Sequence, residues 1–220
     1  MQDINARALF NGEHETCAIG HLDGGEALDR KFRHAGYVTV SIPMVDLAQT
    51  KRPSQIWKEL PADRRLMAAD AFWRDDNAFA EQAEGIAMIA QRIKFRLKSV
   101  QALPTEKKAR HLVALPAVSE GMAARLLVSF HLVHQRPMMA AFLDALGIAH
   151  EDGMIAHEEL TAPDAARLTA AASTLAGSYP AADVSLYFST LLWQDPDTWG
   201  GLADLPLMQH SASDAASPRT

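Results

Sequence analysis

The chain has 220 residues, of which 48% are hydrophobic and 22% charged, as expected for a globular protein of one domain with a packed core. A single cysteine, Cys17, excludes an internal disulfide and fits a reducing compartment, so we expect a cytoplasmic protein. No apolar stretch is long enough to span a bilayer, and the net charge of -6 argues against nucleic acid as the main partner.

Low aromatic content (7%) and few runs of β-branched residues predict an all-α fold. Residues 1–43 have little periodicity and predict a poorly ordered N-terminal arm, at whose end 38–45 could form a short extended segment. The helical domain is expected over 44–205. Small polar residues over 206–220 predict a disordered tail.

Helical signals begin at Ser54, which is placed to cap a short helix over 55–60. Pro61 then fits the first turn of a second helix, because its missing N–H has no partner within a helix there. An apolar stripe at helical spacing predicts the next helix and its buried face. The stripe consists of Phe79, Ala83, Ile86, Ala90 and Ile93.

Pro104 opens a further helix, and Ser119 can cap the helix 120–134, which is apolar nearly all round and should lie at the centre of the domain. Pro137 starts the next helix, and Gly147 should end it in a left-handed conformation. Two more helices are expected at 163–175, closed by Gly177, and at 180–193, with a last turn at 195–202.

Four predicted helices share a proline at their entry. These prolines, at positions 61, 104, 137 and 180, are separated by 43, 33 and 43 residues, a spacing that would suit a short α-solenoid of helix pairs. The sequences between them do not match, and proline is common in the first turn of any helix. We therefore favour an irregular bundle of about seven helices.

The charges are unevenly distributed along the chain. From Leu143 to the C-terminus the only basic residues are Arg167 and Arg219, among many acids, whereas the segment 92–111 has one acid, Glu106. Its basic residues are Arg92, Lys94, Arg96, Lys98, Lys107, Lys108 and Arg110.

This basic segment predicts a contact with an anionic partner, for which we expect a protein or a second copy of the chain. Alternatively, the basic and acidic halves complement each other within one molecule or across a dimer. Apart from Phe95, no aromatic residue is interleaved with the cations, which argues against single-stranded nucleic acid.

His131 and His134 lie three residues apart on the helix 120–134 and could together bind a metal ion, with a third ligand from another helix. Candidate third ligands are His111, Glu158 and Glu159. The alternative is that both are ordinary residues near a helix C-terminus, where the helix dipole favours a cation.

Other possible sites are weaker. His14, Cys17 and His21 lack a second pair of ligands, and HEDGMIAHEEL (150–160) fails as a calcium loop, because Ile148 and His150 stand where oxygen ligands are needed. The sequence contains no phosphate loop, nucleophile elbow or dinucleotide-binding turn, so no cofactor is expected.

The stretches RPMMAAFLDALGIAHEDG (136–153) and YPAADVSLYFSTLLWQDPDTWG (179–200) resemble a group of uncharacterised bacterial all-helical proteins. The resemblance covers about Met44 to Leu202, and implies no activity, cofactor or site. It implies only that the preceding arm is peculiar to this chain. We therefore expect a non-enzymatic interaction or regulatory protein. The alternative is a metal- or small-molecule-binding helical protein, possibly an enzyme, centred on His131 and His134.

Overall fold

The computed structural model describes residues 51–155 and 160–209, all within the unit Asp46–Thr220 into which the chain divides. This part of the chain is mostly helical, which confirms the all-α class, and its one sheet has two short strands. The predicted arm, the segment 38–45 and the residues His14, Cys17 and His21 lie outside the described residues.

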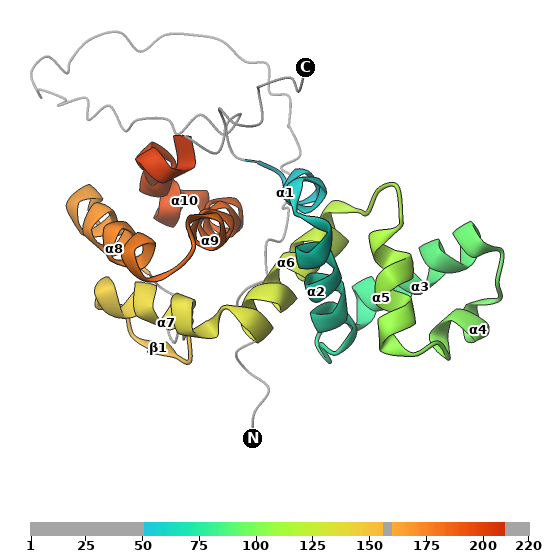
Figure 1. Cartoon of the computed structure of the whole chain (residues 1–220). Coiled ribbons are helices and arrows are strands. Elements are labelled where there is room, and N and C mark those ends of the chain that lie inside the picture. The colour runs from blue at the N-terminus through green and yellow to red at the C-terminus, as the bar shows by residue number, and fades with distance from the viewer. Residues whose placement is uncertain (1–50, 156–159, 210–220) are drawn as a thin grey trace, which may run out of the picture. The chain divides into compact units, whose positions relative to one another are not determined.

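Figure 1 shows the helices in chain order. They are α1 (Pro53–Glu59), α2 (Ala62–Trp73), α3 (Phe79–Ile93), α4 (Leu97–Gln101), α5 (Thr105–Val113), α6 (Glu120–His134), α7 (Arg136–Ala145), α8 (Ala165–Ser178), α9 (Ala181–Gln194), α10 (Pro196–Trp199) and the 3-10 helix η2 (Gly200–Asp204). Strands β1 (His150–Glu151) and β2 (Met154–Ile155) pair antiparallel between α7 and α8.

Helix α1 begins one residue before Ser54, so the predicted capping role of Ser54 is wrong. Arg52 occupies the N-cap position and Pro53 the first turn, where proline is preorganised for a helix. The Ser54 hydroxyl instead donates to Glu120 Oε1 over 2.6 Å, and its backbone N–H donates to Oε2 of the same carboxylate over 3.0 Å. Ser54 therefore ties α1 to the first turn of α6.

The apolar stripe predicted the buried face of helix α3 in part: Ala90 is buried and Ile86 and Ile93 pack against the first apolar cluster. Phe79 at the start of the stripe is 80% exposed and Ala83 is also exposed, whereas Gly85 and Ile89 are buried. A Cβ atom at Gly85 would lie 3.2 Å from the ring of Trp73, so the glycine allows α2 and α3 to approach closely. The prediction considered only apolar side chains at helical spacing. It therefore did not include Gly85, which has no side chain and lies on the buried face.

Helix α6 is buried along most of its length, which confirms its predicted central place. The Ser119 hydroxyl accepts the N–H of Met122 over 3.2 Å, as a helix N-cap should, and every residue from Met122 to His131 is buried. Helices α1, α2, α3, α7 and α9 all contact α6.

The chain from α7 to α8 turns sharply twice. Gly147 has a φ of +62° and ends α7 in the left-handed conformation that was predicted. Asp152 (φ +50°) and Gly153 (φ +83°) then form the tight turn of the β1–β2 hairpin. Helix α8 starts with Asp164 as its cap and continues through Gly177 to Ser178, so the predicted stop at Gly177 is wrong.

Two apolar clusters form the core. The first joins α1 to α6 and includes Leu186 from α9; the second joins α7, α8, α9, α10 and η2. Residues 206–209 are helical, and Leu207 and Met208 pack against the second cluster. The ordered chain therefore extends past residue 206, where the tail was predicted to begin.

A buried ion pair joins the end of α2 to the middle of α6. Arg125 Nη2 lies 2.8 Å from Asp75 Oδ2, and the Ser129 hydroxyl donates to the same oxygen over 2.7 Å. The N–H of Asn77 donates to Asp75 Oδ1 over 3.0 Å. The Asp75 carboxylate is nearly buried, but it accepts hydrogen bonds from three groups, so its negative charge is compensated.

Replacing Asp75 by alanine should lower the free energy of unfolding by about 3–5 kcal/mol, since Arg125 would lose its buried counter-ion. The matched control is Asp70→Ala, which breaks the solvent-exposed ion pair with Arg74 and should cost less than about 1 kcal/mol. Urea unfolding of both variants measures the difference, and equal losses would contradict the structural role given to Asp75.

Replacing Gly153 by alanine should also destabilise the protein, by roughly 1–3 kcal/mol. A Cβ atom there would lie 2.9 Å from Met139 Cβ and 3.1 Å from the carbonyl oxygen of Arg136, and the positive φ disfavours any side chain. Gly177→Ala is the control, because that helical position has no neighbour within 4 Å of an added Cβ. We expect the control to unfold at an equal or higher urea concentration than the parent.

Candidate functional site

The basic segment begins where α3 ends. Lys94 adopts the left-handed conformation (φ +58°) at the C-cap, and the N–H of Phe95 donates to the carbonyl oxygen of Ala90 over 3.1 Å. Arg96 is extended and forms the N-cap position of α4. The chain thus leaves α3, crosses in three residues and enters α4, which packs beside α3.

Six of the seven predicted partner-binding residues are exposed. Only Lys108 is half-buried, with its ammonium 4.9 Å from the ring centroid of Trp73, and Arg110 forms an ion pair with Glu106 one turn away. The others form no ion pair within the described part of the chain. They are Arg92, Lys94, Arg96, Lys98 and Lys107.

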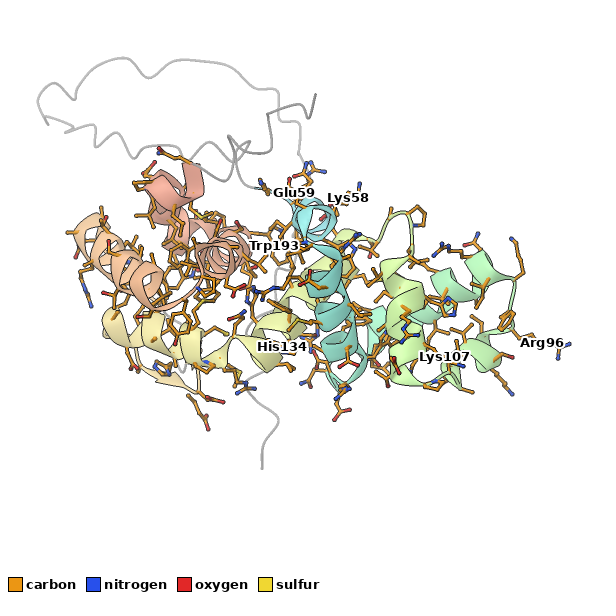
Figure 2. The ribbon with its side chains drawn as sticks, viewed as in Figure 1. Lys58, Glu59, Arg96, Lys107, His134 and Trp193 are labelled. Atoms are coloured by element: carbon orange, nitrogen blue, oxygen red, sulfur yellow. The ribbon has the colours of Figure 1, made fainter. Side chains whose placement is uncertain are left out.

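Two exposed apolar side chains alternate with these cations. Phe95 and Leu97 are each 56% exposed, and Arg96 between them points away from the helices in Figure 2. We call residues 92–98 (RIKFRLK) the basic tip. Sequence reasoning singled out Phe95 only as an aromatic and did not predict that both side chains would be exposed; the available signal was an alternation over 94–98 that fits no helical face.

Among the described residues, no cation of the basic segment forms an ion pair with an acid of the C-terminal half. An ion pair that links the two halves of the chain joins Arg64 of α2 to Asp183 of α9 over 2.9 Å, and Arg64 lies outside the basic segment. Acids such as Asp144 and Asp164, in the C-terminal half, pair or cap within their own half.

The two histidines that were predicted to share a metal ion lie in different environments, His131 buried and His134 exposed. His131 is fully buried, and its Nε2 lies 3.0 Å from Thr190 Oγ1 on α9. Because the Thr190 hydroxyl donates to the carbonyl oxygen of Leu186 over 2.9 Å, it accepts the proton of His131 Nε2. The ring also makes an edge contact with Tyr187, at 5.5 Å between centroids.

Burial lowers the pKa of His131 from 6.5 to about 3, so the ring is neutral near pH 7. Its Nδ1 atom is buried and has no hydrogen-bond partner in the described structure. Burial also raises the pKa of Tyr187 well above its ordinary value. The pair is therefore an uncharged contact between α6 and α9.

His134 is exposed and packs its ring against Phe130, with 5.4 Å between centroids. No group of three His, Cys, Asp or Glu side chains in residues 51–155 and 160–209 is placed to hold a metal ion. His111 is on α5 and is half-buried, while Glu158 and Glu159 lie in the undescribed stretch. The described residues thus give the predicted metal site no third ligand.

The HEDG stretch forms a hairpin turn. Asp152 pairs with Arg136, and His150 Nε2 lies 3.1 Å from Asp144 Oδ1. The Asp152 carboxylate of the stretch that failed as a calcium loop is thus paired with an arginine.

No helix in the described ranges is both long and apolar enough to cross a membrane. The chain matches no protein-family model, no curated protein and no solved structure. Within the described residues, the basic tip and the neighbouring cations of α5 form the most distinctive surface.

The buried His131 makes stability depend on pH. The unfolded chain takes up a proton at this residue near pH 6.5, whereas the folded chain does so only near pH 3. Because the unfolded state then binds more protons, the free energy of unfolding should fall as pH drops below 6.5, by roughly 2 kcal/mol between about pH 7 and pH 5.

Urea unfolding at both pH values tests this dependence. His131→Gln, which cannot titrate, should lose most of it, whereas His134→Gln removes an exposed histidine and should keep it. An unchanged dependence in His131→Gln would show that other groups cause it.

Proposed function

We propose that this chain is a non-enzymatic binding protein that engages an anionic partner through its basic face. This face comprises the basic tip and the cations of α5, and is complete within residues 92–110. The observation that carries the proposal is that five exposed cations have no ion pair among the described residues of a chain whose net charge is -6. A partner that brings negative charge relieves their mutual repulsion.

The backbone beneath the basic face is held by the first apolar cluster. Val100 of α4 and both Ala109 and Leu112 of α5 are buried, and α3 contacts both helices. The cations therefore stand on packed helices, so a partner would meet a surface whose backbone is already ordered. Figure 2 shows Arg96 and Lys107 in the same part of the molecule.

The sequence favours an acidic protein or a second copy of the chain as this partner, within the cytoplasm. A second copy would offer exposed carboxylates of the C-terminal half, such as Glu151, Asp197 and Asp204. Regulation of another protein is the role that such a surface suits, because a charged surface can bind a partner without performing chemistry on it.

We also infer that the helices form an irregular bundle rather than a short solenoid. In a solenoid each repeat contacts only its neighbours. Here α9 contacts both α1 and α6, and Leu186 of α9 joins the first apolar cluster. These long-range contacts support the bundle.

Binding to poly-L-glutamate, a model of an acidic partner, tests the proposal on the full chain. We expect measurable binding at low salt, weakened roughly tenfold or more by the double reversal Lys94→Glu with Lys98→Glu and lost at high salt. The control reverses Lys58 and Arg74, which are exposed but outside the basic face. No binding by the parent, or equal weakening by both double variants, would refute the proposed function.

A further inference from the structure

We propose that the anionic partner is the surface of a phospholipid bilayer, with Phe95 and Leu97 inserted among the headgroups and the surrounding cations bound to lipid phosphates. This inference rests on the proposed function and names the class of its partner. It replaces the acidic protein that the sequence alone favoured, because it also accounts for the exposed apolar pair.

The backbone at the basic tip presents these side chains outward. The left-handed turn at Lys94 ends α3, and the extended Arg96 leads directly into α4. Phe95 and Leu97 thus flank Arg96 at the point where the chain passes from one helix to the next, and both remain 56% exposed. Their exposure to water is unfavourable, and transfer into an apolar layer would remove that cost.

The charge around the apolar pair matches an anionic membrane. Residues 92–98 contain four cations and no acid. The nearest acids along the chain are already engaged, Glu84 by the hydroxyl of Ser119 and Glu106 by Arg110. Each cation near an anionic bilayer adds roughly fivefold to the affinity, while phenylalanine and leucine lie at the boundary between headgroups and acyl chains.

A bilayer fits this surface better than the other polyanions do. A protein partner would need a pocket shaped for two protruding apolar side chains as well as the charges, whereas lipids rearrange around them. A nucleic acid could stack a base on Phe95, but it offers nothing to Leu97. A lipid surface can contact both the cations and the two exposed apolar side chains of the tip.

A second exposed phenylalanine, Phe79, can be compared with Phe95, because acidic rather than basic residues surround it in the sequence. Phe79, at the opposite end of α3, is 80% exposed, but its charged neighbours in sequence are Asp76 and Glu81. An anionic membrane would repel that end of the helix. Phe79 is therefore a matched control for the insertion of Phe95.

The experiment is flotation of the full chain with two kinds of vesicle, pure phosphatidylcholine and phosphatidylcholine with about 30% phosphatidylserine, at about 0.1 M salt. We expect binding only to the anionic vesicles. The variant Phe95→Ser with Leu97→Ser should bind them roughly tenfold more weakly, and Lys94→Glu with Lys98→Glu roughly thirtyfold or more. Phe79→Ser should bind like the parent.

Parallel binding to poly-L-glutamate separates this inference from the proposed function. The serine variant should keep its affinity for poly-L-glutamate within about twofold, because its cations are intact. Binding to poly-L-glutamate without binding to anionic vesicles would overturn the membrane inference and leave the proposed function standing, with an acidic protein as the partner. Failure to bind either probe would overturn both.

Equal vesicle binding by the parent and the serine variant would also overturn the inference, since binding would then not require insertion. All the substituted side chains are exposed, so the variants should fold. Thermal unfolding of each variant checks this, and Lys94→Gln with Lys98→Gln offers a milder change of charge that should still weaken vesicle binding.

Discussion

Helix α6 has no face in water between Met122 and His131, and the rest of the fold depends on that constraint. A helix buried on all sides needs neighbours on all sides, and α1, α2, α3 and α9 supply them. Its two large polar side chains are matched separately, Arg125 by Asp75 at the end of α2 and His131 by Thr190 on α9. Because both contacts join segments far apart in the chain, they also hold the end of α2 and α9 against α6.

Several helix boundaries could be predicted because they depend on local sequence. The Ser119 cap and the left-handed Gly147 depend on a few neighbouring residues, and both were found where the sequence indicated. The place of Gly85 on the buried face of α3 was missed because it depends on how closely α2 approaches, which no periodicity reveals. Helix α4 was missed because it is short and begins with the exposed Leu97, so it has no continuous apolar face.

Some features of the candidate site could likewise be predicted from the local sequence, whereas others depend on tertiary packing. A run of cations is visible in the sequence, but whether each cation meets an acid is decided by the packing of other helices. The exposed apolar pair at the basic tip became evident only with the turn at Lys94. His131 and His134 lie on the same helix, three residues apart, but their environments differ. Thr190 of α9 contacts His131, whereas His134 is exposed to water. Helical spacing alone could not distinguish them.

The place of Leu186 in the first apolar cluster has a consequence for synthesis on the ribosome. Helices α1 to α6 emerge without Leu186, and the side of α6 that carries His131 stays uncovered until α9 has left the exit tunnel. Completion of the N-terminal core is thus a late event in translation. A chain that stops before α9 would display an apolar strip to chaperones and proteases, which links survival of the nascent protein to the arrival of its C-terminal third.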